Sequence, residues 1–600
     1  MFRYTCLLVF LTCCSSPFCQ QPAYPRNYFR NPLAIPMQLS ANFGEIRPDH
    51  WHMGLDIRTN QKENQLVYAA AEGYIAHIGV RPGSFGRFIV INHPNGLSTL
   101  YAHLNDFFPE LNSYVIQEQY KQESWAIELD FSPDLFPVTK GKFIAYSGNT
   151  GGSQGPHLHF EIFDTKTTKR LNPLLFGLPI PDAMPPTLSR LAMYDRHLSM
   201  YNQSPQLFSV KLTDSGYILP KDPVIKTGSN RVSFGIQAFD KSNPGSSPNG
   251  IYLAELQVDG QPQIRFVIDS IDYEQTAAIN AHIDYRYDYY GGASLQLLSV
   301  FPGDKSPVYK KINSNGLIEL NDTAIHRVEI LIKDADQNTS RLQCLLQYSD
   351  SLARTEKYDA PGQLYFPGQI NVVTQPSFVA VIAADALYDT IPAVYYSSEA
   401  RSAFSVSAAH TVNDDYIPLH SSISVRMRPN RDIPADWRNR ILIRRTAKGS
   451  SVKKAKWEDG WLSASFGDFG TYQAFADTTA PIINAPGTGD TINLSRASLL
   501  YFTPRDNFGV IRNFRAELDG QWLCFTNDKG KNWIYKFDER CPYGVHQLRV
   551  QVEDLAGNTT DKTWWFRRDP YTPPVKKQPL KKSSGKKTGT KKSVGSHRKK

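Results

Sequence analysis

Short apolar runs separated by glycine-rich turns fill the first third of the chain. They begin at residues 64 (NQLVYAAAEGYIAHIGV), 86 (GRFIVINHPNGLSTLYAHL), 141 (GKFIAYSGNTGG) and 156 (PHLHFEIF). Runs of this length, bounded by Gly, Asn and Pro, predict antiparallel strands joined by hairpins. A proline-rich stretch, LNPLLFGLPIPDAMPP at residues 171–186, then predicts a domain boundary.

The remainder contains a degenerate internal repeat. VSFGIQAFDKSN, IYLAELQVDGQ and HRVEILIKDADQNTS are echoed, in the same order, by LLYFTPRDNFG, RNFRAELDGQ and HQLRVQVEDLAGNTT. Each set contains a strand ending in Asp, a strand closed by an Asp-Gly turn, and an alternating strand before Asp and Asn. This order predicts two β-sandwiches of immunoglobulin-like type, with a further β-rich segment between them.

The predicted fold is therefore mainly β: one antiparallel-sheet domain followed by β-sandwich domains. A chain of 600 residues is too long for a single core, which agrees with several domains. The predicted divisions are a leader at 1–20, the histidine-rich domain at 25–180, immunoglobulin-like sandwiches at 187–347 and 477–568, a β-rich domain at 348–476, and a basic tail at 569–600.

The first stretch, MFRYTCLLVFLTCCSSPFCQQ, has a basic residue, a short apolar run and then small polar residues. This pattern predicts a secretory signal peptide, and hence export to the periplasm or cell envelope, because the run is too short to span a membrane. A buried strand and a lipoprotein anchor are the alternatives. Beyond the leader only Cys344, Cys524 and Cys541 remain, and Cys524 with Cys541 is the candidate disulfide.

The net charge of +9 comes from the C-terminus. Residues 571–600 contain ten Lys, one Arg and no acid, so this segment carries +11 and the rest of the chain −2. Such a composition predicts a disordered tail that binds anionic envelope polymers, or one that is merely solvated. It does not indicate a specific nucleic-acid partner. The sequence predicts no transmembrane span.

Seven of the fourteen histidines fall between His50 and His159. In a strand, GPHLHFEIF places His157, His159 and Glu161 on one face. A catalytic zinc takes three protein ligands and leaves one position open, and His52 and Asp56 of HWHMGLDI with His159 or His157 would supply such a set. Each signal alone is weak, because an isolated H-x-H is more often a polar sheet face. Other histidines in this region have simpler interpretations: His77 and His93 as structural residues, and His50 as a neighbour of the site.

HMGLD, YAHL and SGNTGGSQGPHLHFE, taken together, resemble the three sequence blocks of the LytM/lysostaphin-type peptidoglycan metalloendopeptidases. The resemblance extends over residues 42–163. It implies one Zn²⁺ per chain held by His52, Asp56 and His159, with His157 and His103 as catalytic histidines. It also implies a secreted endopeptidase acting on the stem peptides of peptidoglycan, in cross-links that end in D-Ala rather than in glycine bridges.

The chemistry agrees with this interpretation. Zinc lowers the pKa of a bound water to about 7, and no H-E-x-x-H helix supplies a glutamate base, so a histidine fills that role. We expect His157 to be the base and His103 to stabilise the oxyanion or orient the water, although the two roles are exchangeable. Glu161 is expected to support a metal ligand or to be structural, rather than to be catalytic. The long connection at residues 105–137 is expected to form an ordered flap beside the cleft.

Two other classes of function compete with the peptidase. One is a non-catalytic LytM-like module that binds or activates cell-wall hydrolases. The other is an envelope scaffold or adhesion protein, whose β-sandwiches bind other envelope proteins. Degenerate modules typically lack metal ligands, and this sequence retains all five histidine and aspartate positions.

Overall fold

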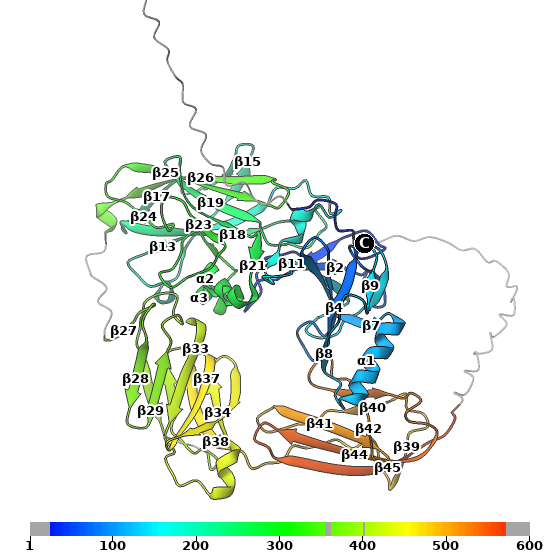
Figure 1. Ribbon diagram of the computed structural model, residues 1–600. Helices are drawn as coiled ribbons and strands as arrows, with labels where there is room; N and C mark the ends of the chain where they lie inside the picture. Colours follow the sequence, from blue (N-terminus) through cyan, green and yellow to red (C-terminus); the bar gives the residue numbers. More distant parts are fainter. Residues whose placement is uncertain (1–23, 222, 354–361, 400–401, 572–600) are drawn as a thin grey trace, which may run out of the picture.

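The computed structural model describes residues 24–571, except 222, 354–361 and 400–401 (Figure 1). The predicted leader and nearly all of the predicted basic tail lie outside the described residues. The predicted mainly-β fold is confirmed: strands dominate, and the longest helix is α1 (Pro109–Lys121). In the described part of the chain, no helix has both the length and the apolarity needed to cross a bilayer.

The histidine-rich region forms an antiparallel sheet in the order β1-β2-β11-β6-β5-β4-β8, facing a small sheet in the order β3-β10-β7. Apolar side chains between them, such as Ile57, Tyr101 and Phe160, are fully buried. The elements are β1 (Leu39–Ala41), β2 (Leu55–Arg58), β3 (Leu66–Tyr68), β4 (Gly73–Val80), β5 (Arg87–Asn92), β6 (Leu97–Ala102), β7 (Leu104–Phe107), β8 (Ile127–Asp130), β9 (Pro137–Val138), β10 (Phe143–Ser147), β11 (His157–Asp164), β12 (Arg170–Leu171) and η1 (Pro173–Phe176).

The second group of strands packs directly against the first. Its apolar core includes Phe43, Trp51 and Met53 from the histidine-rich region, and β12 pairs with β21 across the junction. Its elements are β13 (Thr187–Asp195), η2 (Met200–Asn202), β14 (Gln206–Ser209), β15 (Lys211–Thr213), β16 (Gly216–Ile218), β17 (Val224–Thr227), β18 (Arg231–Phe239), β19 (Leu253–Val258), β20 (Gln261–Val267), β21 (Ser270–Ile271), η3 (Tyr273–Ala278), α2 (Ile279–His282), α3 (Tyr285–Tyr289), β22 (Gln296–Leu297), β23 (Tyr309–Lys311), β24 (Ile318–Glu319), β25 (Ile325–Lys333), β26 (Thr339–Tyr348) and η4 (Asp350–Leu352).

The third group consists of two five-stranded sheets, β28-β29-β33-β37-β36 and β31-β32-β38-β34-β35, around one apolar core. Its elements are β27 (Leu364–Tyr365), β28 (Asn371–Gln375), β29 (Phe378–Ile382), β30 (Ile391–Pro392), β31 (Tyr395–Ser398), β32 (Ala409–Val412), β33 (Pro418–Met427), η5 (Ala435–Arg440), β34 (Ile441–Thr446), β35 (Ser450–Lys454), β36 (Lys456–Glu458), β37 (Trp461–Asp468) and β38 (Gly470–Ala476).

The fourth group pairs the sheet β39-β45-β44-β41-β42 with the short sheet β40-β43. Its elements are β39 (Thr491–Asn493), β40 (Leu499–Phe502), β41 (Ile511–Leu518), β42 (Gln521–Trp522), β43 (Trp533–Lys536), β44 (Gly544–Asp554) and β45 (Thr559–Arg568). The residue numbers at which the chain divides into domains, and the immunoglobulin-like assignment, stay predictions.

The internal repeat extends to individual hydrogen bonds. His326 contacts Asp259 through Nδ1 and Oδ2 at 2.8 Å, and His546 contacts Asp519 through the same atoms at 2.7 Å. Both aspartates stand before the glycine of a tight turn and have positive φ, 50° and 49°. The two sets of strands therefore share local structure as well as sequence pattern.

The chain closes on itself, so that the fourth group lies beside α1 of the first (Figure 1). Tyr120 of α1 packs on Trp522 with ring centroids 5.1 Å apart, and Arg515 forms an ion pair with Glu123 at 2.6 Å. The disulfide proposed for Cys524 and Cys541 is wrong, because both are free thiols. Cys541 is buried in the core of the fourth group, whereas Cys524 packs against the core of the first.

Candidate metal and catalytic site

Two neighbouring strands carry the centre of the histidine-rich cluster. The predicted strand at PHLHFEIF is confirmed as β11, and it pairs with β2 so that His159 lies opposite Asp56. On the other side of β11, His159 lies opposite Ala102, the last residue of β6, and His103 follows immediately. The antiparallel register thus brings His159 close to Asp56, 103 residues earlier in the chain, and to the end of β6.

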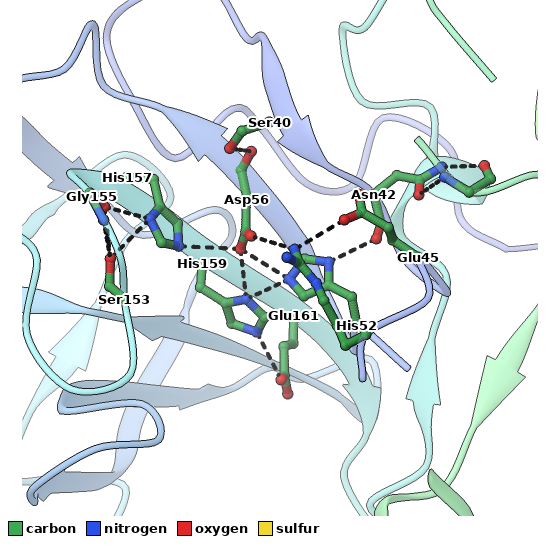
Figure 2. Close-up of polar contacts among 12 residues, drawn as sticks. Ser40, Asn42, Glu45, His52, Asp56, Ser153, Gly155, His157, His159 and Glu161 are labelled. Carbon is green, nitrogen blue, oxygen red and sulfur yellow. Dashed lines mark hydrogen bonds and ion pairs between the residues drawn. The ribbon is translucent and has the colours of Figure 1, made fainter. Parts of the chain in front are cut away.

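Three side chains converge on one point (Figure 2). Asp56 Oδ1 lies 2.9 Å from His52 Nε2 and 3.0 Å from His159 Nδ1, and the two ring nitrogens are 3.0 Å apart. All three residues are buried. The three sequence-predicted ligands therefore form a group that is able to hold a metal ion.

The outer ring nitrogens fix which nitrogen of each histidine carries the proton. His52 Nδ1 lies 2.7 Å from the carbonyl oxygen of Asn42, which only accepts, so Nδ1 donates and Nε2 presents a lone pair inward. His159 Nε2 donates likewise to Glu161 Oε1 at 3.0 Å, which leaves Nδ1 facing the cluster. Two imidazole nitrogens and one carboxylate oxygen, each oriented by an outer partner, match the donor set that zinc prefers.

The electrostatics of the cluster favour a positive charge at its centre. Burial would raise the pKa of Asp56, but the charge of His52 and hydrogen bonds from His157 and His159 hold it well below its usual range. Burial would lower the pKa of His159, but hydrogen bonds to Asp56 and Glu161 raise it to about 9. Without metal, a second proton on the His159 ring, at Nδ1, supplies this positive charge. A bound cation would replace that proton at the lone pair of Nδ1.

Gly54 allows the two strands to approach. A Cβ atom at this position would lie 2.5 Å from the carbonyl oxygen of Phe160 and 3.0 Å from His159 Cε1. Any larger residue would therefore displace β11 or the His159 ring. This explains why the ligands His52 and Asp56 are separated by a segment with glycine at its centre.

His103 and His157 lie beside the three converging side chains. His103 Nδ1 donates to the carbonyl oxygen of Thr150 at 2.9 Å, and His157 Nδ1 donates to that of Gly155 at 2.8 Å. In the neutral rings both Nε2 atoms therefore carry a lone pair. Nε2 of His157 lies 3.3 Å from Asp56 Oδ1 and donates to this carboxylate when the ring is protonated. Burial, and then the charges of His159 and His157, lower the pKa of His103 to about 3, so its ring is neutral near pH 7.

The cluster opens into a cleft of about 1310 Å³. Among the described residues that line it, Asp56 is the one carboxylate, whereas four arginines take part: Arg47, Arg58, Arg81 and Arg170. His50 is on the wall, and among the described residues its side chain bonds only to neighbouring Asp49, at 2.6 Å. His77 pairs with Asp130. His93 Nδ1 donates to Glu72 O, and its Nε2 is hydrogen-bonded to the Thr99 hydroxyl, so both histidines are structural.

The predicted flap at residues 105–137 is ordered but has a different position. No described residue of this segment lines the cleft. Instead, one face of α1 packs on the core of the first group, and Tyr120 of α1 contacts Trp522 of the fourth group. The fourth group reaches the cleft by another route: Lys529 Nζ donates to Ser153 O at 2.6 Å, and Gly83 N donates to Asp528 O at 3.0 Å. The contacts of this distant segment thus support two loops of the cleft wall.

Sequence reasoning missed the residues that hold Glu161. This side chain is fully buried and contacts His159 Nε2, Arg170 Nε at 2.8 Å and the hydroxyl of Tyr273. Burial opposes ionisation, but these hydrogen bonds and the Arg170 charge lower the pKa of Glu161. Tyr273 comes from the second group of strands, 112 residues along the chain, where no motif indicated it.

Glu161→Gln is expected to weaken zinc binding about 10- to 100-fold, because the amide replaces the charge that orients the His159 ring. Competition with a chromogenic chelator measures this affinity. Tyr273→Phe is the matched control: it removes one hydroxyl contact with Glu161 and keeps the charge, so its effect is expected to be smaller. An unchanged affinity in Glu161→Gln would show that this carboxylate does not act on His159.

The comparisons with known proteins agree with this site. Residues 50–120 match Peptidase family M23, and residues 364–477 match a Zu5-like domain. The first match ends before β11, so the His157 and His159 strand lies outside the matched residues. The chain carries a domain of Peptidase family M23.

Two relatives are similar to part of this chain. An uncharacterized metalloprotease of Haemophilus influenzae is 31% identical over 163 residues, which are 26% of this chain and 28% of the relative. The DD-carboxypeptidase/endopeptidase Mpg of Neisseria meningitidis is 32% identical over 131 residues, 22% of this chain and 24% of the relative. The chain thus spans about a quarter of the length of these relatives. The lysostaphin catalytic domain of Staphylococcus simulans is similar at 22% identity and a TM-score of 0.17, covering 22% of this chain and 87% of that structure.

Proposed function

We propose that the protein is an exported zinc-dependent endopeptidase that hydrolyses peptide cross-links of peptidoglycan. The observation that carries the proposal is the convergence of His52 Nε2, Asp56 Oδ1 and His159 Nδ1 at the base of an open cleft. Zinc held there would polarise a peptide carbonyl and lower the pKa of a water molecule. Each ligand histidine already carries its proton on the outer ring nitrogen, which leaves a lone pair on the inner nitrogen, as metal binding requires.

His157 is the proposed general base. Its Nε2 presents a lone pair to the cleft while Gly155 O holds Nδ1, so the ring is oriented to take a proton from the attacking water. The resulting cation lies 3.3 Å from Asp56 Oδ1, which stabilises it. His103 is more costly to protonate, since burial lowers its pKa to about 3, and its proposed role is to accept a hydrogen bond that orients the water.

The charge of the cleft supports a peptidoglycan substrate. Stem peptides carry free carboxylates, and four arginines line the cleft. Three of them form ion pairs within the chain, Arg47 with Asp56, Arg81 with Glu128 and Arg170 with Glu161. Arg58 has no ion pair among the described residues, so it is the arginine proposed to bind a substrate carboxylate. The name of the Neisseria relative, DD-carboxypeptidase/endopeptidase, favours a cross-link that involves D-Ala. A further relative, 30% identical over 129 residues, is the cell division protein DipM of Caulobacter vibrioides, which favours an envelope location.

The proposed partners are peptidoglycan stem peptides in the cleft, other envelope proteins on the β-rich groups, and anionic envelope polymers on the basic tail. The complete set of ligands and flanking histidines argues against a purely non-catalytic module.

Purified full-length protein incubated with peptidoglycan is expected to release cleaved muropeptides, which liquid chromatography with mass spectrometry identifies. Cleavage is expected to stop with a chelator and to return on addition of Zn²⁺. The masses identify the bond that is cut. Cleavage that persists in chelator would refute a metal-dependent reaction, and retention on peptidoglycan without any cleavage would support the binding module instead.

A further inference from the structure

Outside the cleft, two clusters of aspartates occupy equivalent places in the repeated groups of strands. The first consists of Asp182, Asp240 and Asp334, and the second of Asp477, Asp506 and Asp554. In each cluster, one aspartate follows a strand, one lies at the turn of the final hairpin, and one precedes the first strand of the group. The first are Asp240 after β18 and Asp506 four residues after β40, the second Asp334 and Asp554, and the third Asp182 and Asp477. In each cluster the oxygens lie within 4.8 Å of one another.

The hydrogen bonds around the two clusters are also equivalent. Asn338 Nδ2 donates to Asp334 Oδ2 at 2.8 Å, and Asn558 Nδ2 donates to Asp554 Oδ2 at the same distance. Asp182 Oδ1 accepts from the backbone two residues on, as does Asp477 Oδ1. The same arrangement has thus been kept in two segments whose sequences otherwise differ widely.

The first cluster contains oxygens that lack a partner. Asp240 is 5% exposed and Asn249 is 7% exposed, yet neither Oδ1 has a hydrogen-bond partner among the described residues. Both residues line a cavity of about 20 Å³ together with Asp182, Asp334 and Asp336, which is room for one ion or water molecule. Burial, and then the neighbouring carboxylates, raise the pKa of Asp240, because like charges oppose its ionisation.

The second cluster shows the same feature. Asp477 is 1% exposed, its Oδ1 accepts two hydrogen bonds, and its Oδ2 has no partner in the described part of the chain. Asp506 Oδ1 is also buried and without a partner there. Burial raises the pKa of Asp477, with Asp506 and Asp554 adding to the effect.

We propose that each cluster binds one Ca²⁺ ion. Calcium is a hard cation that takes carboxylate and amide oxygens at 2.3–2.6 Å, so ligands on opposite sides of the ion lie about 5 Å apart, close to the spread of these oxygens. The absence of a nitrogen or sulfur ligand distinguishes both sites from the proposed zinc site. Asn249 supplies a fourth oxygen in the first site.

The two ions would fix the junctions between groups of strands. Asp182 lies in the segment that leaves the M23 domain, and Asp477 directly follows β38 of the third group. In the first site the neighbouring Gly250 exchanges hydrogen bonds with the side chain of Asn42, whose carbonyl holds His52. Calcium would therefore cross-link each incoming segment to the sandwich that follows it.

Isothermal titration of the full chain, with one equivalent of Zn²⁺ present, tests this proposal. We expect two Ca²⁺ per chain in the natural protein, one in Asp240→Asn, one in Asp506→Asn and none in the double variant. Asp459→Asn, in an exposed turn, is the matched control and should keep two. Calcium should raise the Tm of the natural protein by roughly 5 °C and leave that of the double variant unchanged.

A second measurement separates ion binding from a structural role. Without calcium, the double variant should unfold at a Tm equal to or above that of the natural protein, because the amides remove repulsion between carboxylates. No binding by the natural protein would refute the sites and would indicate carboxylates that share a proton. Two ions retained by the double variant would refute the assignment to these residues, and equal binding of Mg²⁺ would refute the assignment to calcium.

Discussion

His159→Ala is expected to lose at least about 10³-fold in peptidoglycan cleavage, together with stoichiometric zinc. The substitution removes one of three ligand atoms and leaves Asp56 and Glu161 without the ring that joins them. The metal's stabilisation of the transition state amounts to several kcal/mol, and each 1.36 kcal/mol corresponds to a tenfold change in rate. Muropeptide release measures the activity, and atomic absorption on the purified protein measures the bound zinc.

Because the substitution also leaves two buried carboxylates less well paired, it should cost about 1–3 kcal/mol in the free energy of unfolding. His93→Ala is the matched control: His93 is buried in the same domain and hydrogen-bonded through both ring nitrogens, but it lies outside the cluster. It should lose stability and keep one zinc per chain. Full activity in His159→Ala would refute the zinc peptidase, since no fold defect produces that result.

Two short segments of the candidate site have the local geometry that the sequence predicts, because each depends on neighbouring residues alone. The alternation in PHLHFEIF places His157, His159 and Glu161 on one face through the geometry of a single strand, and β11 has that geometry. Glycine in HMGLD likewise follows from the close approach of two neighbouring strands. The first feature depends on the two-residue period of a strand, and the second on steric contact between neighbouring strands. Both can be predicted from a short stretch of sequence.

Contacts between segments that are far apart in the sequence could not be predicted from short motifs. Tyr273 reaches Glu161 only because the second group packs against the first, and Lys529 reaches Ser153 only because the fourth group lies beside α1. The interpretation of residues 105–137 as a flap failed for the same reason: the aromatic Tyr120 faces Trp522 instead of the cleft. Cys524 faces the first core, which is why proximity in sequence to Cys541 did not make a disulfide.

His157→Ala is expected to retain zinc and to lose about 10²- to 10⁴-fold in kcat, the range for removal of a general base. His157 does not belong to the three converging ligands, and its Nε2 faces the cleft, so its loss should affect the chemical step and leave metal binding intact. The retained zinc distinguishes this variant from His159→Ala. Added imidazole should restore part of the activity, because the side chain borders the open cleft that the small base would enter.

His50→Ala is the matched control, since His50 lines the same cleft and its side chain bonds only to Asp49 among the described residues. The activity of this variant should stay within about twofold of the natural protein's. His103→Ala separates the two histidine roles. If His157 is the base, imidazole should rescue His157→Ala and fail to rescue His103→Ala, because the His103 ring is more deeply buried and its Nδ1 is fixed by Thr150. Rescue of His103→Ala alone would exchange the roles, and normal kcat in His157→Ala would exclude this residue as the base.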